Sequence, residues 1–134
     1  MIDVGPVWER GYSGKGVRVR INDHGMDYTH GEFQDRFDTL GSCDNATYLP
    51  VIQDVASHGT AVASIVGGSG DNGLCSVGIS PNVTISACNA FNETIRPIVF
   101  GLLIDQHDIS QNSFGLAGWR HKRSFSRNPT IFRR

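Results

Sequence analysis

Two short polar motifs, 35 residues apart, constrain the fold of this chain more than any other feature. Residues 17–21 (Val-Arg-Val-Arg-Ile) alternate β-branched residues with arginine, which predicts a strand, and residues 22–25 (Asn-Asp-His-Gly) follow directly. Residues 57–60 (Ser-His-Gly-Thr) open a run of small and apolar residues that predicts a helix, with the serine as its N-cap and two glycines at its end. Asp23 is therefore expected at the carboxyl end of a strand and His58 in the first turn of a helix.

The rest of the chain alternates between strand-like and helix-like segments. A polar turn is expected at residues 69–73, strands at residues 83–88 and 108–113, and an apolar helical segment at residues 98–104. This alternation predicts an α/β fold with a mainly parallel sheet flanked by helices. Because such folds build their sites at the carboxyl edge of the sheet, Asp23 and His58 should converge there.

Length and composition indicate one globular domain or part of one. The chain has 134 residues, of which 39% are hydrophobic, and its formal net charge is -1. No stretch approaches the roughly 18–20 apolar residues of a membrane span. The N-terminus lacks the basic and apolar regions of a secretion signal, so we expect any such signal to lie upstream of this sequence.

The composition changes near Leu116. Residues 1–116 hold all 13 acidic residues but only six of the 12 lysines and arginines. Residues 117–134 carry the other six and show no helical or strand periodicity, which predicts a disordered basic tail. Basic residues interleaved with aromatic ones can contact RNA or an acidic membrane. A short tail of this kind is more often a disordered end, so no nucleic-acid partner is predicted.

Cysteines and glycosylation sequons favour the secretory pathway or the extracellular space. The three cysteines, Cys43, Cys75 and Cys88, cannot all pair within the chain, so at least one is free or lacks its partner. Asn-X-Thr sequons begin at Asn45, Asn82 and Asn92.

The motifs around Asp23 and His58 resemble those of the subtilisin-like serine proteases, and within them the kexin and furin-type proprotein convertases. The family's Asp motif matches residues 21–25 (Ile-Asn-Asp-His-Gly), and its His motif matches residues 58–64 (His-Gly-Thr-Ala-Val-Ala-Ser). The Asp also precedes the His, as in the subtilisin triad. Matches at residues 8–17, 29–33 and 72–79 extend the likeness to about residues 4–116.

The resemblance implies roles for five residues. Asp23 would orient the imidazole of His58 and stabilise its cationic form, and His58 would act as general base and then general acid. Residues Ser113, Phe114 and Gly115 look like the family's exposed strand that pairs with an extended peptide or protein substrate.

The resemblance also implies a structural calcium ion. Residues at the family's calcium-binding positions offer oxygen ligands, which suit this hard cation. They are the side chains of Glu32 and Asn72 and the carbonyls of Ser69, Leu74 and Ser76. Glu32 replaces the usual Asp and has a longer side chain.

Several departures from the family pattern bear on activity. His24 stands where kexin-like enzymes have Asp, and residues 92–115 hold few of the acids that select basic substrates there, which argues against cleavage after paired basic residues. The family's oxyanion-hole Asn and its Gly-Thr-Ser-Met-Ala segment, which carries the nucleophile, are absent. We therefore expect the N-terminal part of a serine endopeptidase domain, inactive alone. The alternative is a noncatalytic, protease-like peptide-binding or inhibitory module.

Two other readings of the motifs are weaker. His24, His30 and Asp27 could be imagined as zinc ligands, but no Cys or His cluster completes a tetrahedral site. Residues 11–16 (Gly-Tyr-Ser-Gly-Lys-Gly) suggest a phosphate-binding loop, yet they precede the expected strand instead of following it. Cys75 is expected to be a buried or unpaired cysteine, because nothing indicates an activating base beside it.

Overall fold

The computed structural model describes residues 2–33, 35–43, 58–74, 76–91 and 106–115. Two helices and three strands lie in these ranges. They are α1 (Gly5–Glu9), β1 (Arg18–Asp23), α2 (His58–Gly67), β2 (Thr84–Asn89) and β3 (Ile109–Asn112). The expected helix and the three expected strands are thus present within one or two residues of their expected starts. Ser57, Cys75, residues 98–104 and the tail at residues 117–134 lie outside the described residues.

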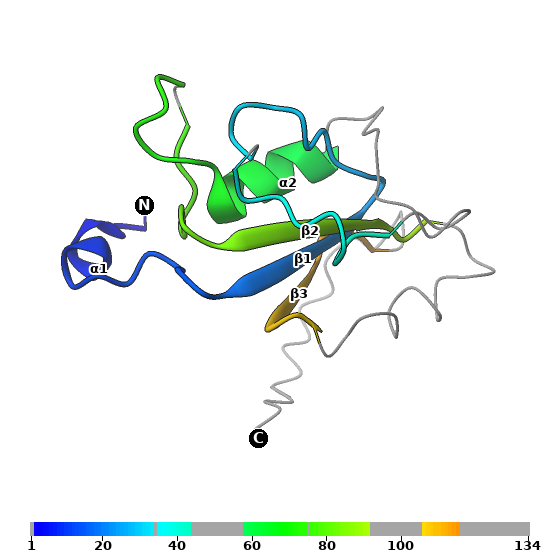
Figure 1. Cartoon of the computed structure of the whole chain (residues 1–134), viewed down its shortest axis with the longest axis horizontal. Coiled ribbons are helices and arrows are strands. Elements are labelled where there is room, and N and C mark those ends of the chain that lie inside the picture. Colours follow the sequence, from blue (N-terminus) through cyan, green and yellow to red (C-terminus); the bar gives the residue numbers. More distant parts are fainter. Residues whose placement is uncertain (1, 34, 44–57, 75, 92–105, 116–134) are drawn as a thin grey trace, which may run out of the picture.

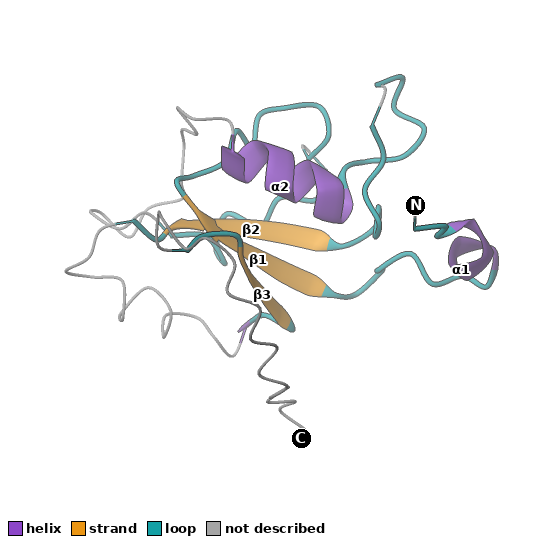
Figure 2. Ribbon diagram, turned by 180° about the vertical axis from the view of Figure 1, so that it is seen from behind, coloured by secondary structure: helices purple, strands orange, loops and turns teal. Residues whose placement is uncertain are grey.

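The three strands form one parallel sheet in the order β2-β1-β3. Val19 in the central strand lies opposite Ile85 in β2 and Ile109 in β3. Figure 1 shows α2 lying across one face of the sheet, and the reverse view in Figure 2 shows α1 standing apart beyond the start of β1. The α/β prediction with a parallel sheet is confirmed.

The two faces of β1 differ because successive side chains of a strand point to opposite faces. Val19 and Ile21 face α2 and belong to a buried apolar cluster, whose other members are Met26, Phe33, Ala63, Val83, Ile85 and Ala87. The opposite face is polar: the side-chain amide of Asn22 donates to Ser110 Oγ at 2.8 Å and to Asn112 Oδ1 at 3.1 Å. Side-chain hydrogen bonds thus reinforce the β1–β3 pairing at its carboxyl end.

A partly buried arginine that the sequence analysis did not single out connects several segments. The guanidinium of Arg36 donates to the carbonyls of Val83, Glu32 and Gly67 and to Ser69 Oγ, all within 2.9 Å. Burial lowers the pKa of Arg36, and the nearby charges of Glu32 and Asp35 oppose that change. This one side chain satisfies carbonyls at the end of α2 and before β2 that would otherwise lack partners.

Cys43 and Cys88 form a disulfide, with Cα atoms 4.6 Å apart. Both residues are buried, and Cys88 lies within β2. The bridge spans 45 residues of sequence. A loop of that length implies roughly 4 kcal/mol of stabilisation through restriction of the unfolded chain. The sequence left the pairing open, since three cysteines allow three different bridges.

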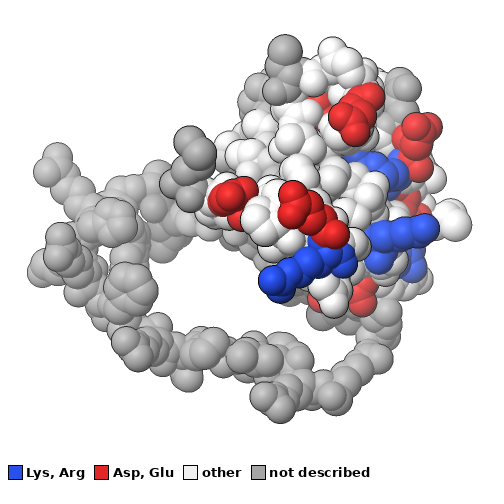
Figure 3. Space-filling model, turned by 90° about the vertical axis from the view of Figure 1, so that its left-hand side faces the viewer, with Lys and Arg blue, Asp and Glu red and all other residues white. Residues whose placement is uncertain are grey.

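The described surface carries charges of both signs. On the face in Figure 3, acidic and basic side chains are intermixed instead of forming one large field. Asn82, which begins the second sequon, is exposed, and its side chain donates to Ser13 Oγ. Within the described residues, no helix has the length and apolar character that a bilayer crossing requires.

Candidate active site

Asp23 and His58 meet at the carboxyl end of β1, as the sequence predicts. The Nδ1 atom of His58 lies 2.8 Å from Oδ2 and 2.9 Å from Oδ1 of Asp23. The Asp23 side chain is 1% exposed, whereas that of His58 is 52% exposed. A buried carboxylate that accepts the Nδ1 proton leaves Nε2 as the basic nitrogen, on a ring that solvent and a substrate can reach.

The glycines of both motifs are required by close packing beneath this pair. A Cβ atom added to Gly59 would lie only 1.9 Å from the carbonyl oxygen of Gly25 and 3.1 Å from Asp23 Cβ. Gly25 itself has φ = 132°, a conformation that side chains strongly disfavour. The start of α2 and the end of β1 can approach each other this closely only because neither Gly25 nor Gly59 has a side chain.

Further hydrogen bonds hold the two motifs together. Thr60 Oγ1 accepts the backbone N–H of Asp27 at 2.9 Å, so the residue two positions after the histidine anchors the loop after β1. Asp23 Oδ1 also accepts the backbone N–H of His24 at 2.8 Å. The Asp23 carbonyl accepts from Ala90, just beyond β2. Asp23 is thus fixed by hydrogen bonds from the start of α2, from the loop after β1 and from the segment after β2.

Residues 113–115 follow β3 and are exposed. The Phe114 ring packs edge-on against Phe91, with ring centroids 5.2 Å apart. The Phe91 ring stacks on His24 with centroids 3.5 Å apart. The segment with the expected substrate-binding role is therefore connected, through Phe91, to the residue next to Asp23. Sequence reasoning missed Phe91, although its place two residues after β2 puts it at the same edge of the sheet as Asp23.

The expected calcium ligands are only partly brought together. Glu32 is 2% exposed, its Oε1 accepts the Ser76 hydroxyl at 2.6 Å, and its backbone carbonyl accepts from Ser69. The other carboxylate oxygen, Oε2, is buried without a hydrogen-bond partner. The Asn72 side chain instead accepts the backbone N–H of Leu74 in its own loop. A buried carboxylate oxygen without a partner is consistent with a cation ligand, so the residues present fit calcium at the Glu32 end of the site.

The hypothesis of a zinc site gains no support in the described part of the chain, where no three His, Cys, Asp or Glu side chains are grouped to hold a metal.

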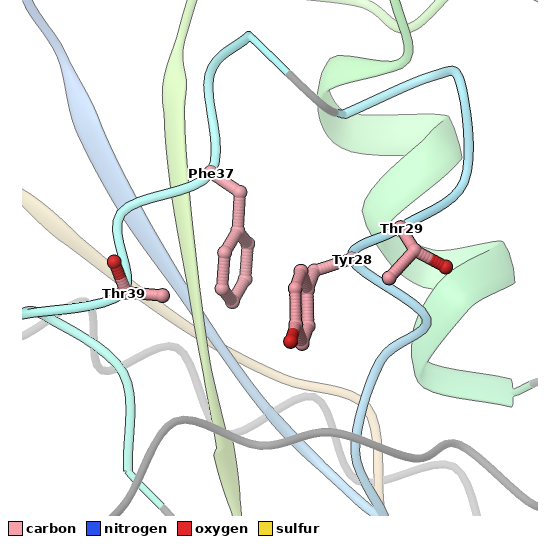
Figure 4. A pocket seen from close by; sticks show the side chains of 4 residues that line it. All are labelled: Tyr28, Thr29, Phe37 and Thr39. Atoms are coloured by element: carbon pink, nitrogen blue, oxygen red, sulfur yellow. The ribbon is translucent and has the colours of Figure 1, made fainter.

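A pocket of about 330 Å³ lies apart from the Asp23–His58 pair and is lined by Tyr28, Thr29, Phe37 and Thr39. Figure 4 shows the Tyr28 and Phe37 rings facing each other, stacked with centroids 4.7 Å apart. Neither Asp23 nor His58 lines this pocket.

The glycine-rich loop before β1 has a packing role. A Cβ on Gly14 would lie 2.5 Å from a methyl group of Val83, and the residue has φ = 89°. The loop precedes β1, whereas a phosphate-binding loop follows its strand.

Residues 14–96 match the model of the subtilase family of peptidases. This chain is a subtilase. The matched range contains the motifs around Asp23 and His58, together with β1, α2 and β2. The expected domain boundary at residue 116 lies beyond the matched range and stays a prediction.

The similar curated proteins are proprotein convertases. Over 98 residues, this subtilase is 36% identical to human proprotein convertase subtilisin/kexin type 5, covering 69% of this chain and 5% of that protein. It is 33% identical to human neuroendocrine convertase 2 over 98 residues, covering 69% and 15% of the two chains. Furin-like protease 2 of Drosophila melanogaster is 30% identical over 102 residues, covering 73% and 6%. The chain thus spans a small part of the length of these relatives.

Solved structures confirm the subtilisin-like fold. The serine protease of Aeromonas sobria matches with a TM-score of 0.68 and 23% identity, over 80% of this subtilase and 20% of that chain. Fervidolysin from Fervidobacterium pennivorans matches with a TM-score of 0.59 and 22% identity, over 76% and 17% of the two chains.

Proposed function

We propose that this chain is the acid–base part of a subtilisin-like serine endopeptidase. The observation that carries the proposal is the contact between the buried Asp23 carboxylate and Nδ1 of the exposed His58, at 2.8 Å. Such a pair prepares an imidazole to accept a proton from a nucleophile. Because the 134 residues contain no Gly-Thr-Ser segment, we expect the chain as given not to hydrolyse peptides.

The proposed mechanism assigns each group one task. His58 Nε2 removes the proton from the nucleophilic serine and later donates it to the leaving amine, while Asp23 fixes the tautomer and stabilises the imidazolium. An extended peptide substrate pairs with the backbone of residues Ser113, Phe114 and Gly115. The exposed position of these three residues beside the end of β3 supports this binding role.

The proposed metal is a structural calcium ion. Glu32 would hold it through the carboxylate oxygen that lacks a hydrogen-bond partner, together with Asn72 and the carbonyls of Ser69, Leu74 and Ser76. The ion would neutralise a buried charge and tie the loop after α2 to the segment before Arg36. It would take no part in bond cleavage.

The proposed location is the secretory pathway or the extracellular space. The Cys43–Cys88 disulfide and the exposed sequon residue Asn82 support it, because disulfides persist in oxidising compartments and sequons are glycosylated there.

The complete transcript tests the proposed enzyme. We expect its sequence to continue the subtilase pattern into an oxyanion-hole Asn and a Gly-Thr-Ser segment. The encoded protein should then react with a fluorophosphonate serine probe, and His58→Ala should reduce kcat by about 10⁴-fold or more. A serine that reacts equally fast in His58→Ala would refute the role of the pair.

The second candidate is a noncatalytic peptide-binding or inhibitory module. The exposed segment at residues 113–115 favours it, because such a segment can pair with an extended peptide without any bond cleavage. A transcript that ends after Arg134, with a product that binds peptides and leaves the serine probe unreacted, would establish this module in place of the enzyme.

A further inference from the structure

Three aromatic side chains meet at the carboxyl edge of the sheet, each just beyond a different strand. His24 follows β1, Phe91 follows β2 and Phe114 follows β3. The His24 and Phe91 rings are stacked at 3.5 Å with 12° between their planes, and Phe114 meets Phe91 edge-on at 5.2 Å. Parallel strands bring their ends to one edge, so residues far apart in sequence build one continuous cluster. We call these three side chains the aromatic platform.

The aromatic platform is directly connected to the catalytic pair. Oxygen Oδ1 of Asp23 accepts both the backbone N–H of His24 and Nδ1 of His58. The residue before Phe91 donates its backbone N–H to the Asp23 carbonyl. The same aspartate that orients the general base therefore also holds the backbone of His24 and of the residue before Phe91.

The platform is open to solvent. Phe91 and Phe114 are each 36% exposed, and His24 is also exposed. Aromatic surface next to a few fixed polar groups is typical of sites that bind a ligand side chain. Phe114 belongs to the exposed segment at residues 113–115, so a peptide that pairs with this segment passes the rings.

We infer that the aromatic platform binds an aromatic side chain of the peptide substrate, close to the bond that is cleaved. This inference rests on the proposed function and specifies its substrate class. The chemistry of the platform favours a neutral ring over a basic side chain, because its members are two phenyl rings and an imidazole. Among the described residues, the carboxylate next to His24 in the sequence is that of Asp23, which is buried and already engaged by His58 and by the backbone of His24.

Contact between aromatic rings sets how much more tightly an aromatic peptide should bind than one without a ring. Aromatic pairs add stabilisation beyond area burial that corresponds to roughly twofold to tenfold in affinity. Burial of the ring itself adds to this. We therefore expect a phenylalanine peptide to bind the platform at least about fivefold more tightly than its alanine counterpart.

The test is a peptide titration of the full 134-residue chain, labelled for NMR. The probes are capped hexa-alanine peptides in which one position at a time is replaced by Phe or Lys. At one position, Phe should lower Kd at least about fivefold, Lys should not, and the ring signals of His24, Phe91 and Phe114 should shift.

Matched variants separate the platform from general peptide binding. Phe114→Ala and His24→Asp should each remove the Phe preference, and the new carboxylate in His24→Asp should favour the Lys peptide instead. Phe114→Leu replaces Phe114→Ala if the latter does not fold. Tyr12→Ala, which removes an aromatic side chain that is 71% exposed in the loop before β1, should leave all affinities unchanged.

The outcomes distinguish this inference from the proposed function. If all peptides bind equally and shift the signals of residues 113–115, the aromatic platform is refuted while peptide binding stands. If no peptide shifts those signals, both the platform and the proposed substrate segment are refuted. A Phe preference that survives in both Phe114→Ala and His24→Asp also refutes the platform.

Discussion

Gly59→Ala is the sharpest test of how the contact between Asp23 and His58 is built. The added methyl would lie 1.9 Å from the Gly25 carbonyl oxygen, and contacts of this kind are not tolerated below 3.0 Å, so the start of α2 would have to retreat by about 1.1 Å. The same movement would lengthen the 2.8 Å contact between Asp23 and His58 beyond hydrogen-bonding range. One methyl group should therefore both destabilise the fold and separate the pair.

The expected cost combines two effects. Overpacking against backbone costs about 1–3 kcal/mol, and loss of a hydrogen bond to a charged group costs about 1.5–3 kcal/mol. The higher helix propensity of Ala offsets at most about 1 kcal/mol. We expect the free energy of unfolding to fall by about 3 kcal/mol, which would lower the urea midpoint by roughly 1–3 M.

Urea unfolding followed by circular dichroism measures this change, and the NMR signal of the His58 Nδ1 proton reports on the pair. Ala61→Gly, an exposed position in the same helix, is the matched control and should cost only about 1 kcal/mol through propensity. A Gly59→Ala chain as stable as the wild type, with an unchanged Nδ1 signal, would refute the packing argument.

Three other perturbations address the metal site, the disulfide and an ion pair. Calcium at about 100 times its Kd should add about 2.7 kcal/mol to the free energy of unfolding and so raise Tm. Glu32→Gln should abolish this rise in Tm. An equal rise in that variant would exclude Glu32 as a ligand. Replacing Cys43 and Cys88 together by Ala should cost roughly 4 kcal/mol in urea unfolding, and a loss below about 1 kcal/mol would contradict a chain-entropy role. Burial raises the pKa of Asp38, but the hydrogen bond and charge of Arg18, together with the backbone N–H groups of Gly41 and Leu40, outweigh this and hold the pKa below the ordinary value. The stabilisation is thus complete above the unfolded pKa of about 3.9 and is lost as pH falls through the lower folded pKa. In an acid titration, the free energy of unfolding of Asp38→Asn should fall less below pH 4 than that of the wild type. A titration curve identical to that of the wild type would refute this role of Asp38.

The sequence predicted the strands, the helix and the convergence of Asp23 and His58 because their signals are local. Alternating β-branched residues indicated β1, and a small and apolar run after His58 indicated α2. Parallel strands bring their carboxyl ends together, so Asp23 and His58 could be expected to converge without any knowledge of side-chain packing.

The features that the sequence did not predict depend on contacts between distant segments. The partner of Cys43 could not be chosen among three cysteines, and nothing around Arg36 indicated that its guanidinium would donate to the carbonyls of Val83 and Gly67 in two distant segments. Phe91 looks like any apolar residue after a strand until its ring is placed on His24. Side-chain partners of this kind depend on tertiary packing, which a periodic pattern does not specify.

The expected calcium ligands also include both features that the sequence predicts and features that it does not. Glu32 and Ser76 are brought into direct contact, while the Asn72 side chain is used within its own loop. The identity of oxygen-bearing residues can be read from a sequence, but the direction of a carbonyl or an amide cannot.

The geometry of the acid–base pair depends on a short part of the chain. The contacts that hold Asp23 and His58 together come from the ends of β1 and β2 and the first turn of α2, through Gly25, Gly59 and Thr60. These positions all lie within residues 14–96, the range that matches the subtilase family. Because those contacts involve neither a nucleophile nor a bound peptide, the pair can form before either is present. In the proposed enzyme, the histidine would then already be oriented when a serine is brought within reach of Nε2, and little of the barrier would be spent on reorganising the base.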